Sequence, residues 1–310
     1  MKIVFFGTPD FAARTLRFLL ENQIDIAAVV TKPDKPKGRS GKLIATAVKQ
    51  VAEEYSIPCL QPEKASDPQF TPVIEKFHAD LFVVVAYGEI IKQHLLDMPK
   101  LGCINVHGSL LPKYRGAAPI QHALINGEAE SGITIQHMAL KMDAGPVIKT
   151  ASCTIGKHTN AAELHDLLCQ LGSQALLDVI YDFKEGVISE TPQDESQVTY
   201  AKKIELEDCE IDWSQPSISI HNLVRGVTPF PGAWTYVTVR GEKKRLKIQK
   251  THPILGSEAL PKKIICYDQN ALTIGTGKGA LNILQLQLEG KRSMSFKEFI
   301  QGVSIKEFSL

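Results

Sequence analysis

The fold class of this chain is decided by the stretch Lys2-Ile3-Val4-Phe5-Phe6-Gly7-Thr8-Pro9-Asp10. Its first five residues are mostly apolar, which is typical of a short buried strand. A turn at Gly7–Pro9 follows, and Asp10 can cap a helix whose apolar residues recur on one face. The stretch therefore predicts a β-turn-α unit, from which a sheet covered by helices is built.

The same alternation continues along the first 190 residues. Further strands are predicted at 24–30, 57–60 and 81–86, with a helix at 45–55 and another that ends near residue 77. The stretch 81–86 is continuously apolar and rich in β-branched residues, as expected for a strand covered on both faces. We therefore expect an α/β fold, a Rossmann-like, mostly parallel sheet with helices on both faces and ligands at the carboxyl ends of its strands.

A different pattern follows a polar, poorly periodic stretch at about 186–210. After one helix near 218–227, short strand-like segments are separated by turn residues, which is typical of a small all-β barrel resembling the OB-fold. The predicted division is a catalytic domain at 1–188, a linker at 189–208 and a barrel at 209–310. The expected barrel strands are 233–239, 245–249, 263–267, 272–274 and 281–287.

Charge is unevenly distributed along the 310 residues. In total, 35 Lys+Arg and 34 Asp+Glu give a net charge of +1, which alone argues against a polyanionic partner. Residues 209–310, however, hold 14 basic and 8 acidic residues, net +6, whereas residues 1–208 hold 21 and 26, net −5. The neutral total therefore excludes little, and its distribution favours a polyanion that contacts both parts.

Composition places the chain among ordinary globular proteins, at 44% hydrophobic and 22% charged residues. The longest apolar stretch, Leu81–Tyr87, is far shorter than the roughly 20 residues of a membrane-spanning helix. The first apolar run is also too short for a secretory signal, so we expect a cytoplasmic protein. The six cysteines include no Cys-x-x-Cys pair, and reduced thiols are therefore expected rather than a zinc site or redox motif.

Asn105 and His107 are the first candidate catalytic residues. They are two positions apart after an apolar strand start, so their side chains leave the same face of an extended segment. An amide donor beside an imidazole could bind a carbonyl oxygen and stabilise the oxyanion of an acyl transfer. The residues alone leave open that Asn105 caps a turn and that His107 has no catalytic role.

Asp143 is the third candidate, in a loop between two apolar strands. Gly145 follows two residues later and allows a tight turn. A carboxylate at this position could orient and charge an imidazole, although an ordinary Asp-x-Gly turn is the favoured interpretation of these residues taken alone.

A family resemblance is carried by three motifs, Asn105-x-His107, Ser109-Leu110-Leu111-Pro112 and Asp143-x-Gly145. Together they resemble the formyltransferase family that uses 10-formyltetrahydrofolate. The match extends over nearly the whole chain, and Gly102–Gln121 is most similar to the branch that acts on methionyl-tRNA. The resemblance implies formyl transfer from the folate to the α-amino group of methionine on initiator tRNA. We expect a monomer, because no large apolar segment is left unexplained.

The resemblance also implies roles for individual residues. Asn105 would hold the formyl oxygen, His107 would stabilise the developing oxyanion, and Asp143 would pair with His107 and help proton transfer through water. No metal is implied, because this transfer needs oxyanion stabilisation and a proton relay more than a Lewis acid. The folate site would be lined by Ser109, Leu110, Leu111 and Pro112.

A basic loop at residues 32–42 holds five basic residues and one acidic residue, interleaved with Pro and Gly. Read alone, such a loop is usually solvated. The resemblance implies instead that it binds the acceptor end of the tRNA, chiefly through Arg39 and with Lys42. Lys113 and Arg115 could extend the same surface.

A second basic cluster lies at residues 240–250, where six basic residues are opposed only by Glu242. In an isolated domain it would be read as a charged hairpin that aids solubility. Beside a domain that handles tRNA, contact with the phosphate backbone is the better interpretation, and it would position the tRNA without reading its sequence. The residues expected to make this contact are Lys243, Lys244 and Arg245.

Three other functions are considered. The catalytic motifs fit a formyltransferase for glycinamide ribonucleotide or for an amino-sugar nucleotide equally well, but a small acceptor needs neither the basic loop nor the basic barrel. A nucleotide-dependent oxidoreductase is disfavoured, because Gly7-Thr8-Pro9-Asp10 lacks the Gly-x-Gly-x-x-Gly spacing. A non-catalytic RNA-binding protein would leave Asn105, His107 and Asp143 unexplained.

Overall fold

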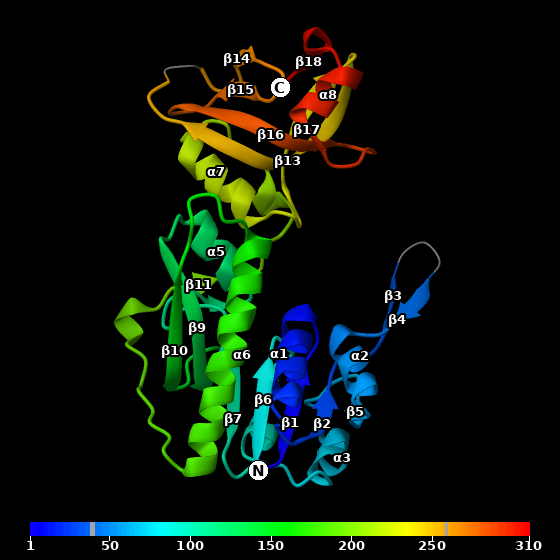
Figure 1. Ribbon diagram of the computed structural model, residues 1–310, viewed down its shortest axis with the longest axis vertical. Helices are drawn as coiled ribbons and strands as arrows, with labels where there is room; N and C mark the ends of the chain where they lie inside the picture. The colour runs from blue at the N-terminus through cyan, green and yellow to red at the C-terminus, as the bar shows by residue number, and fades with distance from the viewer. Residues whose placement is uncertain (38–40, 258–259) are drawn as a thin grey trace. The chain divides into compact units, whose positions relative to one another are not determined.

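The computed structural model describes residues 1–37, 41–257 and 260–310 (Figure 1). Its contacts divide the chain into two compact units. The first unit comprises residues 1–117, 130–153 and 165–201, and the second comprises 118–129, 154–164 and 202–310. Within the described ranges, no helix has the length and apolar character needed to cross a membrane.

The first unit is built on a mostly parallel sheet, as predicted. Within the part of the chain that the structure describes, five strands of this sheet run parallel, and the antiparallel strand β9 pairs with the last of them, β7. In the described residues the strand order is β10 (Val147–Thr154), β9 (Glu130–His137), β7 (Cys103–His107), β6 (Leu81–Val85), β1 (Ile3–Gly7), β2 (Ile26–Val30) and β5 (Cys59–Leu60).

The two central strands, β1 and β6, match the apolar runs that were predicted as buried strands. Every residue of β1 and of β6 is buried, which explains why both read as continuous apolar runs. The expected helix after the first turn is α1 (Asp10–Glu21), which buries Phe11, Leu16 and Leu19 on one face. The remaining helices of this unit are α2 (Ala47–Glu54), α3 (Thr71–Glu75), α4 (Gln93–Leu96) and most of α6 (Ala161–Glu185).

The second unit contains the antiparallel sheet of a small barrel, again as predicted. Along the described chain its order is β14 (Ile264–Tyr267), β15 (Leu272–Gly275), β16 (Ala280–Leu288), β13 (Glu242–Ile254), β12 (Ala233–Val239) and β18 (Phe308–Ser309), with β17 (Met294–Ser295) beside β16. Its core includes Trp213, Leu246, Ile248, Leu281 and Phe296.

Among the described residues of the second unit, three helices accompany this sheet. The predicted helix is α7 (Ser217–Gly226), which packs against α5 (Pro119–Ile125) inside the second unit. The third, α8 (Phe296–Gly302), was not expected, although Ser295 and Glu298 form the capping box that begins it. The assignment of catalysis and tRNA binding to separate parts of the chain stays a prediction, because the division into compact units does not show what each unit binds.

Candidate active site

Asn105 and His107 lie on the last part of β7, at the carboxyl edge of the parallel strands. Their partners across the antiparallel pairing to β9 are Gln136 and Thr134 respectively. Residues that face one another across two strands project from the same side of the sheet, so these four side chains share one face. The alternation predicted from the sequence is therefore confirmed.

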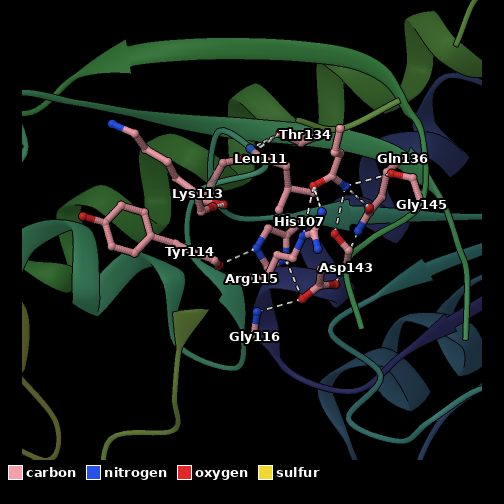
Figure 2. Close-up of polar contacts among 12 residues, drawn as sticks. His107, Leu111, Lys113, Tyr114, Arg115, Gly116, Thr134, Gln136, Asp143 and Gly145 are labelled. Atoms are coloured by element: carbon pink, nitrogen blue, oxygen red, sulfur yellow. Dashed lines mark hydrogen bonds and ion pairs between the residues drawn. The ribbon is translucent and has the colours of Figure 1, made fainter. Parts of the chain in front are cut away.

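His107 is held at both ring nitrogens (Figure 2). Its side chain is buried, with Nε2 at 2.9 Å from the carbonyl oxygen of Tyr114 and Nδ1 at 3.6 Å from Oδ2 of Asp143. A carbonyl oxygen only accepts hydrogen bonds, so Nε2 must carry a hydrogen whether the imidazole is neutral or charged. Nδ1 is therefore the nitrogen that can gain or lose a proton, and it faces the carboxylate.

Asp143 is fixed by contacts on both carboxylate oxygens. Oδ2 accepts the backbone N–H of Gly116 at 2.8 Å, and Oδ1 accepts the side-chain amide of Gln136 at 3.4 Å. Its backbone has φ +51°, a left-handed conformation that is uncommon for non-glycine residues, although Asp adopts it more readily than most. A Cβ at Gly145 would collide with the carbonyl oxygen of His137, so the turn after Asp143 requires glycine. The structure thus brings Asp143 to His107, as the sequence predicted.

Asn105 is half-buried. It shares a sheet face with His107 and Gln136, whose side chains both make hydrogen bonds within the protein. Among the described residues, no protein group hydrogen-bonds its side-chain amide, in contrast to Gln136 and His107. An amide left free at the carboxyl edge of the sheet can donate a hydrogen bond to a ligand oxygen.

The turn from Ser109 to Pro112 is held by its own polar groups. Ser109 Oγ donates to the carbonyl of Lys113 at 2.6 Å, and Thr134 Oγ1 donates to the Ser109 carbonyl at 2.7 Å and accepts the Leu111 N–H at 3.0 Å. Ser109 and Leu111 are buried, whereas Leu110 and Pro112 are only partly covered. The four residues therefore form a rigid rim next to His107.

Arg115 does not lie on the surface, contrary to the prediction. The sequence suggested that it extends a tRNA-binding surface together with Lys113, but its side chain is completely buried, and only Lys113 is exposed. The guanidinium donates to Oε1 of Gln193 from Nε and Nη2, at 3.1 and 2.8 Å, and to Oε1 of Glu195 at 2.8 Å. Its charge is thus paired inside the first unit, while Nη1 is buried with no hydrogen-bond partner among the described residues.

Sequence reasoning missed Gln193 and Glu195 because they belong to the stretch expected to be a plain linker. Glu195 also accepts from Lys141 Nζ at 2.7 Å, and the two cations hold the pKa of its carboxyl near 2. The polar composition of the stretch gave no signal of these contacts, which only the folded chain brings together.

The basic loop is partly described. Its flanks form the hairpin β3 (Lys35–Lys37) and β4 (Lys42–Ile44), and Asp34 at its base pairs with Lys49 at 2.7 Å. The Asp34 carboxylate also accepts from Gln61 at 2.7 Å. Arg39 lies outside the described residues, and of Lys42 the structure describes the backbone, in β4.

The second basic cluster lies on the hairpin between β12 and β13. Lys243 Nζ lies 4.0 Å from the ring centre of Tyr236, and the Arg245 guanidinium lies 4.6 Å from that of Trp234. Lys244 pairs with Glu242 at 2.8 Å. Lys243 and Arg245 thus stand beside aromatic rings on one face of the hairpin, an arrangement that combines positive charge with stacking surface.

The described residues contain no group of three or more His, Cys, Asp or Glu side chains placed to hold a metal ion. The catalytic candidates are an amide, an imidazole and a carboxylate. These groups can supply the oxyanion stabilisation and the proton transfer that acyl transfer requires.

Family comparisons agree with this chemistry. Residues 1–180 match the family described as "Formyl transferase", and residues 203–304 match "Formyl transferase, C-terminal domain". The chain belongs to the formyl transferase family.

Among curated relatives, a methionyl-tRNA formyltransferase of Protochlamydia amoebophila is 54% identical, with 98% of this chain and 96% of that protein covered. Among solved structures, the sugar 3N-formyl transferase WlaRD, studied with dTDP and 5-N-formyl-THF, has a TM-score of 0.69 at 20% identity over 94% of this chain and 99% of that one. HypX from Aquifex aeolicus with tetrahydrofolic acid has a TM-score of 0.66 at 20% identity; 98% of this chain spans 48% of that longer protein. The two structures support the fold.

Proposed function

We propose that this chain transfers the formyl group of 10-formyltetrahydrofolate to the α-amino group of methionine on initiator tRNA. The observation that carries the proposal is the pairing of His107 with Asp143 at 3.6 Å, beside the free amide of Asn105 at the same sheet edge. The 54% identical relative, which bears the name of this activity, supports the choice of acceptor.

In the proposed mechanism the folate supplies an activated formyl carbon. Asn105 donates its side-chain N–H to the formyl oxygen, which gains negative charge as the amine attacks. Because the imidazole of His107 is anchored at Nε2, the positive charge that it gains with the proton of the amine lies in a fixed position near that oxygen. The rim at Ser109, Leu110, Leu111 and Pro112 orients the folate.

The same step requires a proton to move from the attacking amine to the folate nitrogen whose bond to the formyl carbon breaks. Nδ1 of His107 is free to take up and return a proton, and Asp143 stabilises the charged imidazole while it holds one. The new bond joins the methionine nitrogen to the formyl carbon, and no net proton is released. The two residues thus act as a relay.

The tRNA is proposed to contact Arg39 and Lys42 on the loop and Lys243, Lys244 and Arg245 on the barrel hairpin. Residues 1–188 then carry the catalytic and folate-binding groups, and 209–310 supply phosphate contacts that position the tRNA. Tyr236, whose ring is exposed, adds a surface on which a base can stack.

The test is a transfer assay with 10-formyltetrahydrofolate in which Met-tRNA, glycinamide ribonucleotide and an amino-sugar nucleotide are offered in parallel. We expect formylation of Met-tRNA, and a loss of about 100-fold or more in kcat for Asn105→Ala and His107→Ala. His94→Ala, an exposed histidine on α4, is the matched control. Preference for a small acceptor, or near-normal turnover in either site variant, would overturn the proposal.

A further inference from the structure

From the stretch at 189–199, the side chain of Gln193 reaches the turn that carries Asp143. Its amide nitrogen lies 2.8 Å from the carbonyl oxygens of both Asp143 and Gly145, and 3.1 Å from Oε1 of Gln136. Gln193 thus contacts the backbone on both sides of the turn that carries the catalytic carboxylate, together with the side chain that donates to it. All these residues belong to the first unit.

The hydrogen bonds of this cluster determine which way the side-chain amides of Gln193 and Gln136 are oriented. The guanidinium of Arg115 only donates, so it fixes the oxygen of the Gln193 amide on its own side. The nitrogen of that amide must then face the two carbonyls and the oxygen of Gln136, and its two hydrogens are shared among these three acceptors. This in turn leaves the nitrogen of Gln136 to donate to Asp143 at 3.4 Å.

The burial of Arg115 and its ion pair hold these amide orientations in place. Arg115 has no exposed surface, and it is held in place by Glu195, which Lys141 also contacts. Gln193 is half-buried, and reversing its amide would turn the nitrogen towards the donors of Arg115 and away from its acceptors, so the reversed orientation is disfavoured. The turn at Asp143, with its left-handed backbone, needs such external support.

We infer that Gln193 is a positioning residue for Asp143. It fixes the turn that presents the carboxylate to His107, and it sets the orientation of Gln136 so that an amide N–H faces that carboxylate. The inference rests on the proposed function, since it assigns Gln193 a part in formyl transfer. It also means that the stretch predicted as a linker completes the active site.

The test uses two variants of the full chain and one control. Gln193→Glu keeps the shape of the side chain and the acceptor for Arg115, but it places a carboxylate oxygen where the amide nitrogen met the three acceptor oxygens described above. Gln193→Met removes the polar groups at similar volume. We expect kcat to fall about 10- to 100-fold, with the KM for the folate donor changed by less than about twofold, because misplacement of a catalytic group affects the reacting complex more than binding. Gln69→Glu, the same change at an exposed site elsewhere in the first unit, should behave as the native chain.

A double-mutant cycle separates positioning from general structural support. In a chain that already carries Asp143→Ala, Gln193→Met should lower kcat by no more than about twofold, because the residue acts through Asp143. An undiminished loss in that background, or a normal kcat in both single variants that fold with native melting temperature, would overturn the inference.

A crystal structure of Gln193→Glu gives a result that does not depend on the reaction. We expect the Asp143 carboxylate to leave the Gly116 N–H or the Gln136 amide to reverse; an unchanged arrangement would refute positioning by Gln193, even if the native chain formylates Met-tRNA. Conversely, displacement of Asp143 in a protein that does not formylate Met-tRNA would support the positioning and refute the proposed function.

Discussion

Nδ1 of His107 lies 3.6 Å from Oδ2 of Asp143, while the other ring nitrogen is bound to a backbone carbonyl. This relationship defines which nitrogen takes part in proton transfer. Because Nε2 keeps its hydrogen throughout, the two protonation states of His107 differ only on the side that faces the carboxylate. The negative charge of Asp143 therefore acts directly on the proton that the reaction moves.

Removing that charge should be costly to catalysis although it barely changes the shape of the site. In Asp143→Asn the side-chain oxygen can still accept the Gly116 N–H, but the neutral amide cannot stabilise a charged imidazole. We expect kcat to fall about 100-fold or more, as measured in single-turnover transfer to Met-tRNA. Retention of most of the native rate would show that the carboxylate has only a structural role.

The turn after Asp143 should tolerate no side chain at Gly145. An added methyl group would meet the carbonyl of His137, which belongs to the backbone and cannot move aside cheaply. We expect Gly145→Ala to lower the free energy of unfolding by about 2–4 kcal/mol, measured by urea denaturation. Gly302→Ala is the matched control, because a Cβ there meets no atom within 4 Å. Equal stability of the two variants would contradict this account.

The contact of Glu195 with Arg115 and Lys141 should appear in the pH dependence of stability. The contacts lower the pKa of this carboxyl from 4.5 to about 2 in the folded chain. A lowered folded-state pKa stabilises the fold above pH 4.5, and that contribution is lost as the pH falls towards 2. We therefore expect Glu195→Gln to flatten the pH dependence of the unfolding free energy in this interval. An unchanged slope would mean that solvent screens the pair completely.

The cysteines should differ sharply in reactivity. All six are free thiols. Burial raises the pKa of Cys103 to about 12 and that of Cys209 to about 11, whereas Cys266 is exposed. Because the thiolate is the reactive form, a disulfide reagent should modify Cys266 in the native chain and reach Cys103 and Cys209 only after unfolding. Cys266→Ser should abolish the fast phase, and its persistence would contradict the assignment.

The sequence was sufficient to predict the elements whose pattern is local. The strands that became β1 and β6 are continuous apolar runs, and the alternation at Asn105 and His107 placed both side chains on one face of β7. Asp143 was found through its motif rather than through any local pattern. Gln193 and the burial of Arg115 could not be foreseen, because their partners lie about 50 to 80 residues away and polar residues show no periodicity. The two-residue strands β17 and β18 were missed for a related reason, since so short a segment has no recognisable period.

The barrel hairpin yields the last prediction, which concerns electrostatic contact with tRNA. If Lys243 and Arg245 each neutralise one phosphate, replacing either with Ala should weaken binding and reduce the slope of log affinity against log salt concentration by about 1. Fluorescence titration of Met-tRNA over a range of salt concentrations measures both quantities. Lys278→Ala, an exposed charge elsewhere in the second unit, should change the slope much less. Because each of the two cations also lies over an aromatic ring, a loss of affinity with an unchanged slope would indicate that the two side chains act by packing on Tyr236 and Trp234 and not through charge.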